Sequence, residues 1–179
     1  MHRKIASSLR TLYRHDPESM LGAIARHCEF AGDLEAAGDI DGAIAIYEEL
    51  YAQNSGNVLI ANNLSSLIAT HKDDAESLAR AAVIARRLRD AEVPAFQDTY
   101  GWIAYRRDNF DEALEYLEPA AQSLPNDPLV QYHLGMTYVA LEETALARET
   151  LTRALEIAGD SPLPQFEMAR EALASLPAE

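Results

Sequence analysis

Two stretches of sequence decide the fold of this chain. The first, DTYGWIAYRRDNFDEALEYLEPAAQSLPNDP, spans residues 98–128, and the second, YHLGMTYVALEETALARETLTRALEIAGDSP, spans residues 132–162. Small residues recur in them at an offset of 34, pairing Gly101 with Gly135, Ala113 with Ala147 and Ala120 with Ala154. Helices approach closely only where bulky side chains are absent, so the recurrence indicates a repeated helix crossing. A fixed period of roughly 20 to 50 residues is typical of an array of stacked units.

These positions resemble the tetratricopeptide repeat, a helix-turn-helix unit of about 34 residues. The fourth repeat matches it at Leu134, Gly135, Tyr138, Ala147, Leu151 and Ala154, and the third at Tyr100, Gly101, Ala113, Leu117, Ala120 and Pro125. A second repeat fits at Leu64, Ser65 and Ile68, and a first at Phe30, Ala31, Leu34, Ala43 and Tyr47. The small residue at the eighth repeat position is then Ala31, Ser65, Gly101 or Gly135, with two extra residues in the second repeat.

The resemblance implies an all-α fold, a right-handed α-α superhelix or α-solenoid of about four helical hairpins with a capping helix at each end. We expect an N-terminal helix over residues 1–15, a repeat array over 16–160 and a C-terminal capping helix over 161–179. The expected repeats span approximately 24–57, 58–93, 94–127 and 128–160. In the second repeat, two registers stay open, with either Ala79 and Val83 or Ala82 and Ala85 facing the partner helix.

Local signals independently favour helices at these places. Asp16-Pro17, Asp127-Pro128 and Ser161-Pro162 each join an N-cap residue to a proline suited to the first helical position. Asp73-x-x-Glu76 and Asn109-x-x-Glu112 have the pattern of capping boxes. Pro119 lies inside a predicted helix and predicts a kink near Glu115. No stretch alternates with period two, so we expect no strands.

The two ends of the chain carry amphipathic stretches. After the fourth repeat, an apolar stripe at helical spacing comprises Leu163, Phe166, Ala169, Ala172, Leu173 and Leu176. Such a helix covers the apolar face that the last repeat leaves open. Near the N-terminus, Ile5, Leu9, Leu12 and Tyr13 have helical spacing, which fits a capping helix or the remnant of an earlier repeat.

Composition excludes several classes of function. The chain has 15 basic and 29 acidic residues, a net charge of -14, which disfavours nucleic acid as a partner. The single cysteine, Cys28, excludes an internal disulfide and a cysteine-based zinc site. No apolar run approaches the ~20 residues that a bilayer span needs, so we expect no membrane insertion. We expect a cytoplasmic location if Met1 is the native start, and a periplasmic one is open if the chain is a piece of a larger exported protein.

Catalytic and metal-binding patterns are missing from the sequence. It contains no glycine-rich phosphate loop, no His-Glu-x-x-His helix and no Gly-x-Ser-x-Gly elbow. His27 beside Cys28 comes nearest to a metal pair, but adjacent helical residues diverge by about 100°. We therefore predict that the chain is not an enzyme and binds no cofactor and no metal.

The resemblance implies that function lies on the concave wall, which is lined by the first helix of each repeat. The predicted partner-binding residues on this wall and on the cap are Asn62, Ser66, Trp102, Tyr105, Arg106, Tyr132, Met136 and Phe166. The aromatic and apolar members resemble binding hot spots, although ordinary core packing explains them about equally well. A clamp for a C-terminal carboxylate is disfavoured, since Cys28 and Gly32 stand where related proteins use Lys and Asn.

These observations predict a scaffold that binds a peptide or helical segment of a partner protein in the groove. The alternative is a structural subunit that self-associates. Two phrases, NNLSSLIA and DTYGWIAYRRDNFDEALEYLEPA, look like repeats of bacterial proteins linked to polysaccharide export and cell-surface protein sorting, which would place the subunit in an envelope system.

Charge is unevenly distributed along the chain. Residues 108–179 hold 14 acids and three arginines, a net charge of -11, which favours encounter with basic or amphipathic segments. Arg80, Arg86, Arg87 and Arg89 crowd one predicted helix. They fit a dock for an acidic segment, but a solvated outer helix face is the favoured interpretation.

Overall fold

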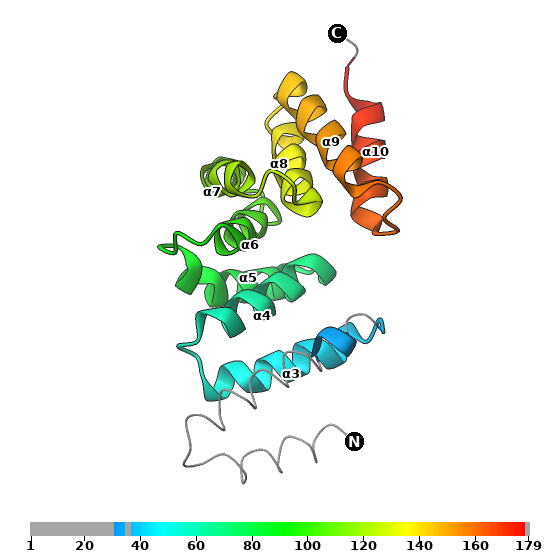
Figure 1. The fold of residues 1–179 in the computed structure, drawn as a ribbon. Helices are drawn as coiled ribbons and strands as arrows, with labels where there is room; N and C mark the ends of the chain where they lie inside the picture. The colour runs from blue at the N-terminus through cyan, green and yellow to red at the C-terminus, as the bar shows by residue number, and fades with distance from the viewer. Residues whose placement is uncertain (1–30, 35–36, 178–179) are drawn as a thin grey trace.

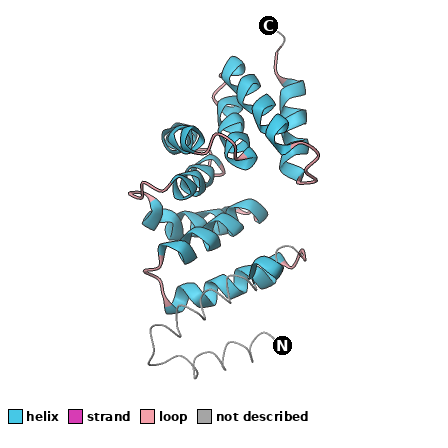
Figure 2. Ribbon diagram, viewed as in Figure 1, coloured by secondary structure: helices cyan, strands magenta, loops and turns pink. Residues whose placement is uncertain are grey.

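The computed structural model describes residues 31–34 and 37–177 of the 179. All regular structure in these ranges is helical, which confirms the predicted all-α class (Figure 2). The predicted N-terminal helix, the cap at Asp16-Pro17 and the pair formed by His27 and Cys28 lie outside the described residues. No helix within the described ranges is long and apolar enough to cross a bilayer.

Successive helical hairpins stack into an α-solenoid that runs from α3 to α10 (Figure 1). The helices in chain order are α3 (Ile40–Gln53), α4 (Val58–His71), α5 (Ala75–Ala85), the 3-10 turn η1 (Arg86–Leu88), α6 (Pro94–Tyr105), α7 (Phe110–Ser123), α8 (Pro128–Ala140), α9 (Thr144–Ala158) and α10 (Pro164–Ser175). α3 is the second helix of the first repeat. The pairs α4/α5, α6/α7 and α8/α9 form the second, third and fourth repeats, and α10 follows as the cap.

Two glycines set the closest helix approach in the third and fourth repeats. A Cβ atom at Gly101 would lie 2.7 Å from Leu117 Cγ and 3.1 Å from the Ala113 carbonyl oxygen. At Gly135 it would lie 2.6 Å from Leu151 Cδ2. Since α6 meets α7 and α8 meets α9 at equivalent residues, the two hairpins are the same packing unit. Ala31 and Ser65, the corresponding small residues of the first two repeats, are fully buried.

The turn between the two helices has one geometry in three of the repeats. Gly38, Asp108 and Glu142 occupy equivalent positions and have φ values of 81°, 60° and 60°. The backbone N–H of the next residue then bonds to a carbonyl five residues earlier, as Asn109 does with Ala104 at 3.0 Å. In the second repeat the equivalent residue, Lys72, is extended, with φ of -117° and ψ of 137°.

The second repeat departs from the pattern because this turn is one residue longer. The predicted capping box at Asp73-x-x-Glu76 is wrong, since Asp74 is the N-cap of α5 and accepts a 2.8 Å bond from the Ser77 N–H. That backbone hydrogen bond lowers the pKa of the Asp74 carboxyl. The open register is also settled. Ala85 is buried and Ala82 half-buried, whereas Ala79 and Val83 are exposed.

Other predicted helix ends have mixed outcomes. Asp127 caps α8 as predicted, accepting bonds from the N–H groups of Leu129 and Val130. Asn109 stands at the N-cap of α7, but its side chain accepts no capping bond. The predicted start of the last helix at Ser161-Pro162 is wrong, because α10 begins at Pro164. The residue before a proline avoids the helical region, and Leu163 is accordingly extended, with φ of -66° and ψ of 132°.

Two remaining features concern α7 and α10. α7 continues through Pro119 to Ser123, and the predicted kink near Glu115 stays a prediction. α10 buries Phe166 and Ala169 against the last repeat and exposes Glu167, Arg170 and Glu171. α10 is therefore apolar on the side that packs on the last repeat and mainly charged on the side that faces away from it.

Candidate partner-binding site

The first helices of three repeats and the cap enclose a hollow of about 420 Å³, which we name the Trp102 pocket. It is lined by Thr70, Asp73, Trp102, Tyr105, Arg106, Tyr132, His133, Met136, Pro164, Gln165 and Met168. These residues come from the end of α4 and the turn after it, from α6 and its C-cap, from α8 and from the first five residues of α10. The pocket is therefore assembled by the stacking of repeats and the cap, since no single hairpin contains it.

Trp102 is the centre of an aromatic stack. The Tyr105 ring lies 4.7 Å from the indole at an interplanar angle of 9°, and the His133 ring lies 4.1 Å from it at 18°. Two rings on one face at these distances would overlap, so Tyr105 and His133 cover opposite faces of the indole. Trp102 is only 7% exposed. The stack makes the floor of the pocket rigid. An incoming group can then contact only the edges of the stacked rings.

A buried polar pair fixes the orientation of His133. Its Nδ1 atom lies 2.8 Å from Asp98 Oδ1, and the two side chains are 12% and 15% exposed. Asp98 belongs to α6 and His133 to α8, so the pair links the third repeat to the fourth directly behind the Trp102 stack.

Tyr132 and Met168 join the fourth repeat to the cap. The Tyr132 hydroxyl donates to Met168 Sδ at 3.7 Å. Tyr132 is 1% exposed, and this burial raises the pKa of its hydroxyl to about 12. Met168 is 50% exposed. An incoming ligand can therefore contact the Met168 side chain far more extensively than the Tyr132 ring.

Arg106 closes the side of the pocket nearest the second repeat. Its guanidinium donates to the Ala69 carbonyl, to the Lys72 carbonyl at 3.0 Å and to Asp73 Oδ1 at 2.5 Å. It also lies 6.0 Å from the Trp102 ring centroid. A cation suits these carbonyls because the C-terminal end of α4 carries a partial negative charge. Arg106 thus links the second and third repeats, and both terminal nitrogens of its guanidinium donate hydrogen bonds within the protein.

Five of the eight predicted site residues line this pocket, namely Trp102, Tyr105, Arg106, Tyr132 and Met136. The other three lie elsewhere. Asn62 and Ser66 are half-buried on α4, and the Asn62 Oδ1 atom is buried with no donor among the described residues. Phe166 is 1% exposed and belongs to the core beneath the cap.

Sequence reasoning missed several of the lining residues. His133 is not among the residues predicted for the concave wall, and the positions of Gln165 and Met168 depend on the start of α10 at Pro164 rather than at Pro162. Gln165 Oε1 is buried and has no donor among the described residues, a state that costs about 1–3 kcal/mol. The lining thus combines aromatic and methionine surface with a few polar groups, the composition of a recognition site.

Acidic and histidine side chains are few around the Trp102 pocket. The described part of the chain holds no group of three or more His, Cys, Asp or Glu side chains placed to bind a metal. The acids and histidine of the Trp102 pocket, Asp73 and His133, are engaged with Arg106 and Asp98. Both side chains are thus engaged in contacts between repeats.

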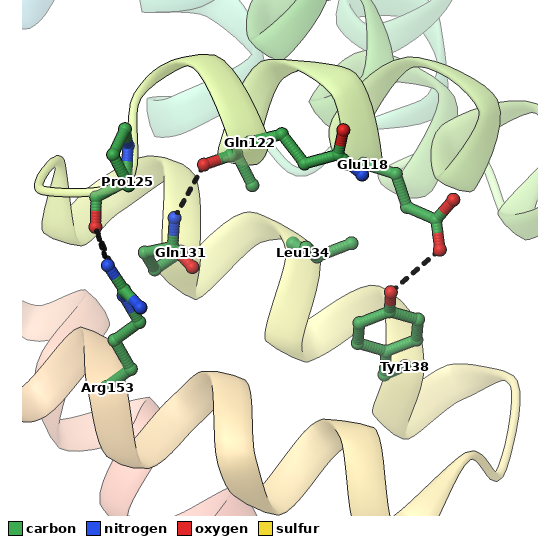
Figure 3. Close-up of a pocket in the computed structure, with 8 residues that line it drawn as sticks. Glu118, Gln122, Pro125, Gln131, Leu134, Tyr138 and Arg153 are labelled. Carbon is green, nitrogen blue, oxygen red and sulfur yellow. Dashed lines mark hydrogen bonds between the residues drawn. The ribbon is translucent and has the colours of Figure 1, made fainter.

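A second hollow, of about 270 Å³, lies among α7, α8 and α9 (Figure 3). Its polar groups bond to one another. Gln131 donates to the Ala121 carbonyl at 3.1 Å, Arg153 to the Pro125 carbonyl at 2.8 Å and Tyr138 to Glu118 at 2.8 Å (Figure 3). Burial and the bond to Glu118 raise the pKa of Tyr138 well above its usual value. These hydrogen bonds connect the third repeat to the fourth, so the hollow lies at a packing interface between repeats.

The stacked hairpins and the pocket on their first helices define the chain as an α-solenoid of the helical-repeat class. Residues 104–176 match the family model described as tetratricopeptide repeat. This segment, which holds most of the third repeat, the fourth repeat and the cap, is therefore similar to tetratricopeptide repeats, in agreement with the resemblance seen in the sequence. No curated protein matches the chain.

Solved structures share the fold at low sequence identity. TTC0263, a thermophilic TPR protein of Thermus thermophilus, has a TM-score of 0.62 and 17% identity over 96% of this chain and 88% of its own. MamA of Desulfovibrio magneticus RS-1 has a TM-score of 0.55 and 16% identity, covering 84% of this chain and 90% of its own. YrrB, described as a TPR protein with an unusual peptide-binding site, has a TM-score of 0.52 and 16% identity over 87% of this chain and 93% of its own.

Proposed function

We propose that this protein is a non-enzymatic interaction scaffold that holds a segment of a partner protein along its first helices, with one apolar side chain in the Trp102 pocket. The observation that carries the proposal is the pocket itself. Its aromatic floor is held in place by stacking on both faces of Trp102, and its walls come from three repeats and the cap. The peptide-binding site of YrrB, a protein of the same fold, supports this proposal.

The accessible residues of the pocket decide which contacts a partner makes. Tyr105, Met136 and Met168 are partly or largely exposed, whereas Tyr132 is buried. Methionine side chains adapt to ligands of different shape because they are flexible and polarizable. We therefore assign the main contacts to Tyr105, Met136 and Met168. Replacing Tyr132 would disturb the core as well as the pocket, which makes it a poor test of binding.

The sole tryptophan of the chain supplies the readout, because Trp102 lies at the pocket floor. Short Trp-free peptides with a central Leu, Phe or Met are titrated into the intact protein, and Trp102 emission is recorded. We expect saturable changes. The variant Met168→Glu places a charge at the pocket mouth and should weaken binding by about 30-fold, equivalent to about 2 kcal/mol.

The matched control is Leu146→Glu, a substitution of the same kind on α9 at a residue that is 43% exposed and does not line the pocket. Equal loss of affinity in both variants, or no response of Trp102 to any peptide, would remove this pocket as the binding site. Sedimentation at several protein concentrations, without peptide, tests the alternative of a self-associating subunit. A monomer at all concentrations eliminates that alternative.

A further inference from the structure

We infer that the partner segment is basic beside its apolar anchor, and that its Lys or Arg residues lie over the acidic turns α6–α7 and α8–α9. This inference rests on the proposed function, since the anchor occupies the Trp102 pocket. It follows from a series of inter-repeat ion pairs that stops before the last junction.

At each of the first two junctions, a cation from the later repeat pairs with an acid of the earlier repeat, either in the turn between its helices or at the start of its second helix. Lys72 at the end of the second repeat's first helix bonds to Asp41 of the first repeat at 2.5 Å. Arg106 at the end of the third repeat's first helix bonds to Asp73 of the second repeat at 2.5 Å. In both cases the basic residue follows the first helix of its hairpin and reaches back along the stack.

The third junction lacks such a cation. Arg106 lies five residues after Gly101, and the residue five after Gly135 is Ala140. Lys72 lies seven residues after Ser65, and the residue seven after Gly135 is Glu142. The fourth repeat therefore supplies an alanine and a further acid where the earlier repeats supply a lysine or an arginine.

Four carboxylates at these two turns have no cationic partner among the described residues. Asp108 and Asp111 belong to the turn α6–α7 and the start of α7, and Glu142 and Glu143 belong to the turn α8–α9. All four are exposed. They lie in residues 108–179, where 14 acids outnumber three arginines. Like charges repel, so a surface of this kind favours a segment that brings positive charge.

These turns directly continue the helices that line the Trp102 pocket. The Asp108 N–H donates to the Tyr105 carbonyl at 2.9 Å, and the Glu142 N–H donates to the Val139 carbonyl at 3.1 Å. Burial raises the pKa of the Tyr105 hydroxyl, Arg106 opposes the rise, and the charge of Asp108 adds to it. Asp108 thus acts electrostatically on a residue of the pocket, and an anchored segment passes within reach of its carboxylate.

The experiment compares two Trp-free peptides with the same apolar centre, one flanked by lysines and the other by glutamates. Each is titrated into the full chain, with Trp102 emission as the readout. At low salt we expect the lysine peptide to bind about tenfold or more tightly, and the difference to shrink near 1 M salt, where the screening length is about 3 Å.

A fourfold variant identifies the acids responsible. Asp108→Asn, Asp111→Asn, Glu142→Gln and Glu143→Gln together should abolish the preference for the lysine peptide. The matched control neutralises four exposed acids away from these turns, through Asp90→Asn, Glu92→Gln, Glu156→Gln and Asp160→Asn. It changes the net charge equally and should retain most of the preference. Circular dichroism and thermal melting verify that both variants are folded.

The outcomes separate this inference from the function on which it rests. Equal binding of both peptides, or equal effects of the two fourfold variants, overturns the basic partner and leaves the pocket intact. No Trp102 response to either peptide overturns the pocket. Self-association of the free protein that disappears in the variant of the acidic turns overturns the inference in favour of a second copy of this chain as the occupant.

Discussion

The junction between the second and third repeats and the junction between the third and fourth are built from different chemistry. At the first, Arg106 binds two carbonyls and Asp73 at the C-terminal end of α4. At the second, Asp98 pairs with His133 and Gln131 donates to the Ala121 carbonyl. Both junctions satisfy their buried polar groups. Only the junction between the second and third repeats also neutralises an acid in the turn of the earlier repeat.

The acidic turn is neutralised within the protein at the junction between the second and third repeats, whereas the acids at the junction between the third and fourth repeats stay unpaired among the described residues. Where a cation of one repeat already pairs with the acid of the preceding repeat, as Arg106 does with Asp73, the acid has no need of a cation from a partner. At the junction between the third and fourth repeats, the exposed carboxylates are unpaired and hydrated. Binding a cation there therefore costs little desolvation free energy. The Trp102 pocket lies between the two junctions and is bounded by both.

The two junctions can be compared only if the third and fourth repeats are equivalent rigid units. The largest predicted effect tests that equivalence. Gly101→Val and Gly135→Val each place atoms inside the contact distance of Leu117 or Leu151. We expect each to lower the free energy of unfolding by about 3 kcal/mol, since overpacking a tight crossing commonly costs about 1–3 kcal/mol and valine adds further atoms. Urea denaturation measures the loss.

Gly56→Val is the control, because a Cβ atom at Gly56 meets nothing within 4 Å. It should change stability by less than about 0.5 kcal/mol, as is usual for exposed positions. If one helix glycine tolerates valine and the other does not, the two hairpins are not equivalent and the comparison between their junctions fails.

The second prediction concerns the junction between the second and third repeats. Arg106→Ala leaves the Ala69 and Lys72 carbonyls without their donor and removes packing against Trp102. We expect a loss of about 2 kcal/mol in stability, since hydrogen bonds that involve a charged group contribute about 1.5–3 kcal/mol each and water replaces part of them. Thermal and urea denaturation measure this, and Trp102 emission reports the change in its surroundings.

Lys72→Ala is the companion variant for Arg106→Ala. It breaks an ion pair whose side chains are 33% and 85% exposed, and such pairs contribute about 0–1 kcal/mol. Arg106→Lys keeps the charge but lacks the planar fork, so it should recover only part of the stability. A lysine that restores full stability would show that charge alone, without the two carbonyl bonds, holds the junction.

Repeats three and four were predictable from sequence because their packing residues recur in register. Gly101 and Gly135 each meet the second helix of their own hairpin, and a 34-residue offset reveals that contact without coordinates. The second repeat was less predictable. With one inserted residue in the turn, the backbone of Lys72 is extended and the N-cap of α5 is Asp74 rather than Asp73. No local sequence pattern distinguishes two adjacent aspartates as N-cap candidates.

The pocket was predictable only in part. Repeat phase assigned Trp102, Tyr105, Tyr132 and Met136 to the first helices, but it says nothing about how deeply a residue is covered by a neighbouring repeat. The contribution of α10 depended on its starting residue, which Pro162 and Pro164 together displace from Ser161. The role of Arg106 in linking two repeats depends on the longer turn between α4 and α5, which belongs to the neighbouring repeat.

The smallest predicted effect comes from giving the junction between the third and fourth repeats the cation that it lacks. Ala140→Arg places a guanidinium on the last residue of α8, at the position equivalent to Arg106 in repeat phase, to pair with Asp108 of the turn α6–α7 or Asp111 at the start of α7. We expect a gain of about 0.5 kcal/mol in stability, the magnitude of an exposed ion pair, together with weaker binding of the lysine-flanked peptide. Ala174→Arg, in the last turn of α10, provides the same change of charge at a helix end away from the acidic turns. If Ala140→Arg stabilises the protein no more than Ala174→Arg and leaves peptide binding unchanged, the two junctions do not differ in the way that the missing cation implies.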